Sequence, residues 1–185
     1  MRKICSAELV ATPLQLGGPG RTVAIDVTAI ASEKSDINAA HPVPTQSVFG
    51  GVDIMSRTFF MEVVSQCDAA TLTPIVAKYI APGSRIWSVE RPAYRHLNQM
   101  GYQHETFDGR GRFVDPVTGV HVNHIRARWS ALKAAMTERE YVPDSHLASY
   151  IDEYVWRHWR ARHSNAKHLS AFADIIAAIR VHYPV

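Results

Sequence analysis

Long hydrophobic runs are missing from this chain of 185 residues. No stretch approaches the roughly 20 consecutive apolar residues that a membrane-spanning helix needs. The amino-terminal segment MRKICSAELV also lacks the apolar core and the small-residue cleavage site of a secretory signal. We therefore expect an intracellular protein that does not enter a membrane, and the sequence does not distinguish among nucleus, cytoplasm and organelle.

Cysteine is scarce, and no single sign of charge dominates. Cys5 and Cys67 are the two cysteines, which is too few for a zinc knuckle or a disulfide framework. The net charge of +3 and the pI near 9.0 permit contact with nucleic acid without requiring it. Basic residues gather in RHWRARHSNAKH, residues 157–168, so any electrostatic footprint is expected toward the carboxyl-terminal half.

The composition is that of a globular protein, with 46% hydrophobic and 20% charged residues. A chain of this length suits one main domain with a smaller appendage. We predict a domain over residues 1–140 and a helical extension over residues 141–185 that packs on it.

Local patterns predict an alternation of strands and helices. RTVAIDVTAI has the pattern of a central strand, and QSVFGGVDI and RTFFMEVVS predict a hairpin. The polar, proline-bearing segment 31–45 predicts a loop. The remaining predicted elements are a helix over 68–80 capped by Asp68, a strand over 85–89, a helix over 92–101, a strand over 102–107, and helices from 123, over 144–162 and over 166–182.

This element order defines the expected fold class. Three antiparallel strands, a helix, a strand, a helix, a strand and then helices match the ribonuclease H-like α/β fold. We therefore predict a mixed sheet of about five strands flanked by helices, with further helices at the carboxyl terminus. This fold supports two-metal phosphoryl transfer by carboxylates from the first strand, the fourth strand and a later helix.

Six separated blocks carry a resemblance to a known family. They are LGGPGRTVAIDVT, VFGGV, AATLTPIVAKYIAPGS, AYRHLNQMGYQH, FVDPVTGVHVNHIRARWSALK and LASYIDEYVWRHW. In order and spacing they resemble the catalytic domain of the Merlin superfamily of DDE transposases, related to the bacterial ISXO2-like group. The resemblance runs from about Cys5 to Trp159 and covers most of the chain.

The resemblance implies a transposase in which three acids hold two divalent cations. Carried onto this sequence, the first acid falls on Asp26, the second on Val89 within WSVERPAY, and the third on Arg126 within HVNHIRARW. Valine offers no oxygen ligand, and arginine places a permanent positive charge where the metals would bind. Two Mg²⁺ ions about 4 Å apart need several carboxylate oxygens, so we predict that the ancestral Mg²⁺ or Mn²⁺ site is lost and that no cofactor is bound.

One neighbouring acid leaves an alternative open. Glu90 lies one residue past the second position, and a shift of one residue along a strand turns a side chain to the opposite face. At a strand end the pleat is often broken, so Glu90 is a candidate shifted acid. We also expect Asp26, deprived of metal, to form a direct salt bridge with Arg126, because a buried carboxylate needs a partner.

Three functions follow as hypotheses. The first is a domesticated, catalytically inactive pseudoenzyme that contacts nucleic acid nonspecifically through basic residues. The second is a scaffold that binds protein partners in a larger assembly of unknown oligomeric state. The third is an active transposase or nuclease that uses Asp26 with Glu90. The candidate nucleic-acid-binding residues, DNA or RNA, are Arg126, Arg128, Lys133, Arg157, Arg160 and Arg162.

Overall fold

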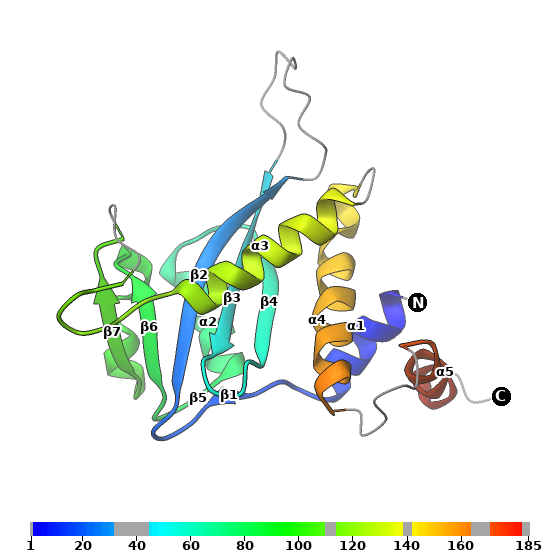
Figure 1. Ribbon diagram of the computed structural model, residues 1–185, viewed down its shortest axis with the longest axis horizontal. Coiled ribbons are helices and arrows are strands. Elements are labelled where there is room, and N and C mark those ends of the chain that lie inside the picture. Colours follow the sequence, from blue (N-terminus) through cyan, green and yellow to red (C-terminus); the bar gives the residue numbers. More distant parts are fainter. Residues whose placement is uncertain (1, 32–44, 110–113, 139–141, 164–170, 183–185) are drawn as a thin grey trace, which may run out of the picture.

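A mixed five-stranded sheet forms the centre of the computed structural model (Figure 1). The structure describes residues 2–31, 45–109, 114–138, 142–163 and 171–182. The strands are β2 (Thr22–Ala31), β3 (Thr45–Asp53), β4 (Phe59–Val64), β6 (Arg85–Val89) and β7 (Gln103–Phe107), in the order β4-β3-β2-β6-β7.

Strand direction completes the topology. The chain folds β2, β3 and β4 into an antiparallel meander, whereas β6 runs parallel to β2 and β7 runs parallel to β6. Helix α2 (Ala69–Tyr79) supplies the crossover from β4 to β6, as a parallel connection requires. This is the ribonuclease H-like fold, and the predicted fold class is confirmed.

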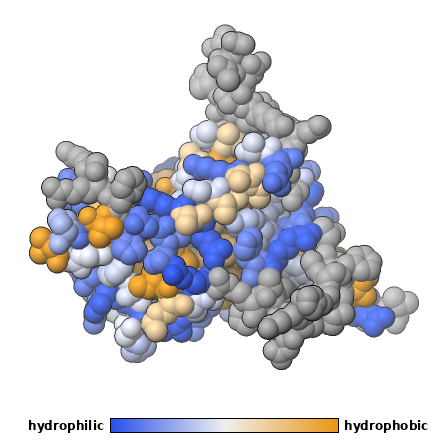
Figure 2. Space-filling view, in the orientation of Figure 1, coloured by the Kyte–Doolittle hydropathy of each residue, from blue (hydrophilic) through white to orange (hydrophobic). Residues whose placement is uncertain are grey.

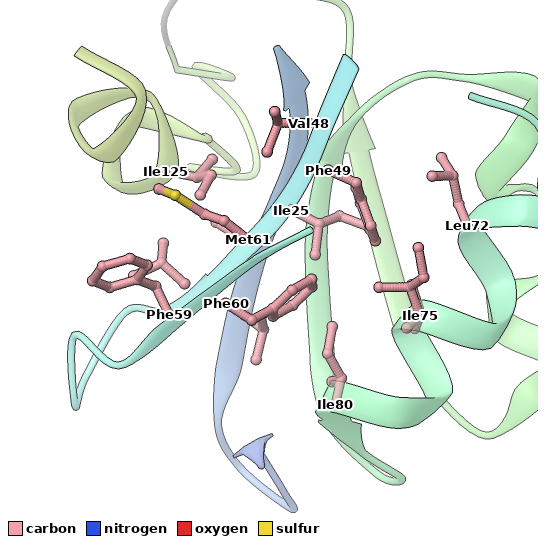
Figure 3. Close-up of a cluster of buried hydrophobic side chains, with 14 of the residues drawn as sticks. Ile25, Val48, Phe49, Phe59, Phe60, Met61, Leu72, Ile75, Ile80 and Ile125 are labelled. Atoms are coloured by element: carbon pink, nitrogen blue, oxygen red, sulfur yellow. The ribbon is translucent and has the colours of Figure 1, made fainter. Parts of the chain in front are cut away.

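Helices cover both faces of the sheet, because successive strand residues point to opposite faces and both faces carry buried apolar side chains. Figure 3 shows Ile125 of α3 (Asn123–Thr137) beside Met61 on one face, and Leu72 and Ile75 of α2 beside Phe49 on the other. Asp68 caps α2 by accepting a hydrogen bond from the Thr71 N–H at 2.8 Å. Side chains of successive strand residues point to opposite faces, so Asp26, next to Ile25, lies on the α3 face.

Three further helices lie beyond β4 (Figure 1): α1 (Arg2–Ala11), α4 (Leu147–His163) and α5 (Ala171–His182). Ile151 and Val155 of α4 are buried in the same core as the sheet. Ser6 of α1 donates a hydrogen bond of 2.6 Å to Asp152 of α4. Helix α4 therefore packs on the sheet, while the predicted division at residue 140 into a domain and a helical extension stays a prediction.

Two details differ from the predictions. Residues 92–101 form two 3₁₀ turns, η1 (Pro92–Tyr94) and η2 (Leu97–Met100), instead of one α-helix. Tyr94 of η1 and Leu97 of η2 are both buried in the core. A small parallel pair, β1 (Leu16–Gly17) with β5 (Ile80–Ala81), was not predicted; its strands of two residues are too short to show a pattern.

Two further predictions, the loop over 31–45 and the helix over 166–182, fall partly outside the described residues. Most of the predicted loop 31–45, residues 32–44, lies outside the described residues, as do residues 166–170 of the last predicted helix. A short 3₁₀ turn, η3 (Asp144–His146), precedes α4. None of the helices in the described ranges is long and apolar enough to cross a membrane.

Candidate active-site cleft

The residues of the predicted triad meet at one end of the central strands. Ala24 of β2 pairs with Trp87 of β6, so Asp26 and Val89, two residues further along each parallel strand, follow on the same face. Arg126 approaches this point from α3. Together they line an open cleft of about 600 Å³, whose other lining residues are Val27, Glu90, Arg91, Pro92, Arg95, Asp108 and Gly109.

Val89 and Arg126 converge beside Gly109. A Cβ atom added to Gly109 would lie 3.0 Å from Val89 Cγ1 and 3.9 Å from Arg126 Nη2. The valine methyl group and the guanidinium group therefore occupy neighbouring space at the edge of the cleft. These two positions, where the resemblance implies acids, present an apolar surface and a positive charge.

Asp26 is half-buried at the edge of the cleft. Its partner across the β2–β3 ladder is Gly50. A larger residue would not fit at this position, because a Cβ atom there would lie 2.6 Å from the Trp129 ring. Burial raises the pKa of Asp26, and this effect outweighs the Val27 N–H and the guanidinium groups of Arg126 and Arg91, which act in the opposite direction.

Two buried polar groups lie near this carboxyl group. The Tyr94 hydroxyl and the Trp129 indole N–H have no hydrogen-bond partner among the described residues. The indole still lowers the pKa of Asp26, although it lies outside hydrogen-bonding geometry in this conformation. Burial raises the pKa of Tyr94, and the nearby charge of Asp26 acts in the same direction.

We expect Asp26→Asn to stabilise the protein at pH 7 by roughly 1 kcal/mol. The pKa of Asp26 is raised in the folded state, so the charged form favours unfolding once the pH exceeds the unfolded pKa of about 3.9. The advantage of the variant should therefore shrink as the pH falls toward that value. Urea unfolding of both proteins at pH 7 and pH 4 measures this, and a variant less stable at pH 7 would contradict it.

The prediction of a salt bridge between Asp26 and Arg126 is wrong. Within the described residues no ion pair joins the two side chains. The reason is that the Arg126 guanidinium lies near Gly109 and Val89, at the β6 side of the cleft. Its charge still lowers the pKa of Asp26, so the two groups interact through space without contact.

Glu90 lines the same cleft as Asp26. Strand β6 ends at Val89, so the strict alternation of faces that would turn Glu90 away no longer applies. The Glu90 N–H donates to the Phe107 carbonyl at 3.1 Å, which holds its backbone beside the end of β7. The shifted acid considered from the sequence is therefore in the cleft, although its side chain is exposed.

Sequence reasoning missed three charged residues of the cleft: Arg91, Arg95 and Asp108. Arg91 and Arg95 flank η1, and Asp108 follows β7 directly. The available signal was positional, because the carboxyl ends of neighbouring parallel strands meet at one edge of a sheet. A charged residue directly after such a strand is therefore a candidate for the cleft.

The described side chains do not fit a pair of divalent ions. Asp26, Glu90 and Asp108 all line the cleft, yet no three His, Cys, Asp or Glu side chains in the described ranges are grouped to hold a metal ion. At the positions where the resemblance implies the second and third acids, the Val89 side chain offers no oxygen atom and Arg126 carries a guanidinium group. We therefore derive no catalytic step through a metal.

The other predicted nucleic-acid-binding residues are dispersed. Arg128 lies over the Phe59 ring, 4.6 Å from its centroid, and donates to the Arg57 carbonyl at 3.4 Å. Lys133 is exposed on α3. Arg157 forms an ion pair with the buried Glu153 at 2.8 Å, so part of its charge is neutralised within α4. The side chains of Arg160 and Arg162, also in α4, lie outside the described residues.

The fold and the position of the cleft define a ribonuclease H-like domain. A sequence profile of the ISXO2-like transposase domain matches residues 25–158. The chain therefore belongs to the ISXO2-like transposase domain family, and the resemblance seen in the sequence is confirmed. No curated protein matches the chain.

Several solved structures resemble the chain at low sequence identity. A chain of the simian T-cell lymphotropic virus intasome, solved in complex with the PP2A regulatory subunit B56 gamma, is 14% identical, with a TM-score of 0.49 over 85% of this chain and 60% of that one. The match thus spans less than two thirds of that chain. The HTLV-2 integrase catalytic core domain in complex with magnesium is 13% identical, with a TM-score of 0.45 over 79% of this chain and 97% of that one. The catalytic core domain of BIV integrase is 10% identical, with a TM-score of 0.47 over 88% and 97%.

Proposed function

We propose that this domain is a catalytically inactive member of its family, retained to bind nucleic acid nonspecifically. The observation that carries the proposal is the convergence of Val89 and Arg126 beside Gly109, at two of the three positions where the family resemblance implies acids. Such a cleft has exchanged metal ligands for an apolar wall and a fixed cation. It has kept the packing of the fold around them.

The charges of the cleft suit phosphate binding without cleavage. Arg91, Arg95 and Arg126 all line it, and guanidinium groups bind phosphate oxygens through paired hydrogen bonds. Phosphate contacts supply sequence-independent affinity. The acids in the same cleft limit this attraction, so we expect weak binding that depends on salt. The positive charge of the arginines would attract a phosphodiester. A guanidinium group stays protonated, so it does not activate water for hydrolysis.

The test is fluorescence anisotropy of a labelled DNA duplex of arbitrary sequence, titrated with the protein in EDTA at several salt concentrations. We expect salt-sensitive binding, and we expect Arg126→Ala to reduce the slope of log affinity against log salt by about 1, the value for one lost phosphate contact. Arg85→Ala is the matched control, because Arg85 lies at the opposite end of β6 and is paired with Glu105 at 3.6 Å.

The outcomes separate the hypotheses. Binding in EDTA that Arg126→Ala weakens and Arg85→Ala does not supports the proposal. Absence of binding at low salt contradicts it and favours the scaffold hypothesis, in which the domain holds protein partners in a larger assembly.

A second candidate function is metal-dependent transposition or DNA cleavage by Asp26 with Glu90. The observation in its favour is that both residues, together with Asp108, line one cleft. Against it stands Arg126, whose charge would oppose cation binding in the same space. Duplex binding that requires Mg²⁺ and leads to cleaved products would support this candidate.

A further inference from the structure

Strand β4 (Phe59–Val64) forms one edge of the sheet, and its hydrogen-bonded strand neighbour is β3. In an antiparallel pair, residues alternate between those whose N–H and C=O groups face the partner strand and those whose groups face away. The Asp53 N–H donates to the Thr58 carbonyl at 2.9 Å, which fixes the phase of this alternation. Counting along the ladder from there, the backbone groups of Phe59, Met61 and Val63 face away from β3.

These outward groups are unpaired in the described part of the chain. No hydrogen bond there reaches the outward N–H or C=O of Met61 or Val63. An edge strand with unpaired backbone groups is a template for another extended segment. The side chains of Phe59, Phe60, Met61 and Val64 are buried, so another segment can reach this edge only where a cavity opens onto it. Here a groove lies along the edge.

The groove has a volume of about 590 Å³ and touches four consecutive residues of β4, Phe60 to Val63. Because the side chains of successive strand residues point to opposite faces, a cavity that touches all four must run along the backbone edge. Its other lining residues come from α1 and the segment after it, from α2 and from α4: Ser6, Leu9, Val10, Pro13, Leu14, Lys78, Tyr79, Ala148, Ile151, Asp152 and Val155.

The walls of the groove are mainly apolar. On the α2 side, the rings of Phe60 and Tyr79 stack with centroids 4.4 Å apart. At the rim, Val10 of α1 is 79% exposed. The face shown in Figure 2 carries its hydrophobic residues in small separate spots, whereas this groove joins apolar side chains from four parts of the fold. Apolar walls beside unpaired backbone groups suit a peptide with alternating apolar side chains.

The ionisable residues of the groove favour a positively charged side chain on a bound segment. Its ionisable residues are Glu62, Lys78 and Asp152, and Lys78 Nζ forms an ion pair with Glu62 at 3.0 Å. One carboxyl group therefore remains without a matching cation. Burial raises the pKa of Asp152; the Ser6 hydrogen bond opposes that shift, the charge of Glu62 adds to it, and the charge of Lys78 opposes it. A lysine or arginine side chain on a bound segment would relieve this repulsion.

We propose that the groove binds an extended segment of a partner protein that adds a strand to the free edge of β4. The segment alternates apolar side chains, which enter the walls, with at least one lysine or arginine that faces Asp152. The occupant is a peptide because the unpaired groups of Met61 and Val63 are spaced for a backbone, and it is cationic because the groove has an excess of negative charge. This site is separate from the nucleic-acid-binding cleft and does not depend on it.

The experiment begins with a phage library of random eight-residue peptides, selected on the wild-type protein and counter-selected on Val63→Pro. Proline is tolerated on an edge strand where its N–H would face away from the sheet, so this variant removes one outward donor and keeps the β3 pairing. We expect enrichment of alternating apolar peptides that contain lysine or arginine. The synthesised peptides should bind Val63→Pro at least tenfold more weakly than they bind the wild type.

Two further measurements keep the result decisive. Val10→Arg changes an exposed rim residue and should weaken binding of the same peptides with little effect on folding. Hydrogen exchange followed by NMR should show the amides of Met61 and Val63 at least tenfold better protected when the peptide is bound. Three outcomes would overturn the proposal. The selection could yield no enrichment, or the peptides could bind the wild type and both variants equally. The third outcome is a dimer of this chain that Val63→Pro dissociates.

Discussion

The double variant Val89→Asp/Arg126→Glu is expected to bind Mn²⁺ at least about 100-fold more tightly than the wild-type protein. It adds two carboxylates and removes one guanidinium group at positions that converge beside Gly109. Together with Asp26 it would restore the three acids that the family resemblance implies. Calorimetric titration with Mn²⁺ measures the effect.

The matched control is Val117→Asp/Arg128→Glu, which makes the same change in charge outside the cleft. Val117 is 91% exposed, and Arg128 does not line the cleft. We expect this control to bind Mn²⁺ as weakly as the wild type does. Equal affinity of the folded double variant and the control would show that Val89 and Arg126 are not the positions that determine metal binding.

Asp53→Ala should lower the free energy of unfolding by about 3–5 kcal/mol, because it leaves three backbone N–H groups without their acceptor at a cost of roughly 1–3 kcal/mol each. The Asp53 side chain is fully buried and pairs with Arg21 at 2.7 Å. It also accepts backbone hydrogen bonds from Gly17 at 3.2 Å, Met55 at 2.9 Å and Ser56 at 3.0 Å. It therefore joins the segment before β2 to the turn between β3 and β4.

The pH dependence of this effect has a definite sign. Burial tends to raise the pKa of Asp53, but the Ser56 N–H, the Arg21 guanidinium, and the N–H groups of Met55 and Gly17 outweigh it, so the pKa is lowered. The stabilisation is present above the unfolded pKa of about 3.9 and is lost as the pH falls through the lower folded pKa. Urea unfolding of wild type and Asp53→Ala should show a difference that shrinks below about pH 4.

Asp68→Ala serves as the control for an ordinary capping carboxylate. Asp68 caps α2 from an exposed position, and loss of an N-cap costs about 0.5–2 kcal/mol. An effect of Asp53→Ala no larger than that of Asp68→Ala would contradict the structural role assigned to Asp53.

The sequence predicted the strands and α2 well because each carries a local signal. Strand β2 alternates small and β-branched residues, and Asp68 marks the start of α2. The 3₁₀ turns at 92–100 could not be distinguished from a helix, since proline before and glycine after are signals that both share. The pairing of β1 with β5 depends on contacts distant in sequence, which no local pattern reports.

For the cleft, the sequence supplied Asp26, Val89 and Arg126 through the family resemblance, and Glu90 through its proximity to Val89. Arg95 and Asp108 join them only because η1 and the end of β7 lie beside β6 in three dimensions. Asp108 carried one signal, its position directly after a predicted strand, whereas Arg95, after η1, carried none. The groove along β4 could not be predicted from the sequence, because it forms where α1, α2 and α4 meet in three dimensions.

The central claim is that the cleft no longer holds the metal ions of its family. Calorimetric titration of Mg²⁺ and Mn²⁺ into the purified wild-type protein and into Asp26→Ala tests it most directly, because metal capture is the first requirement of the ancestral reaction. We predict no stoichiometric binding to either protein. Stoichiometric binding to the wild type that Asp26→Ala abolishes would contradict the account and identify Glu90 as the next residue to substitute.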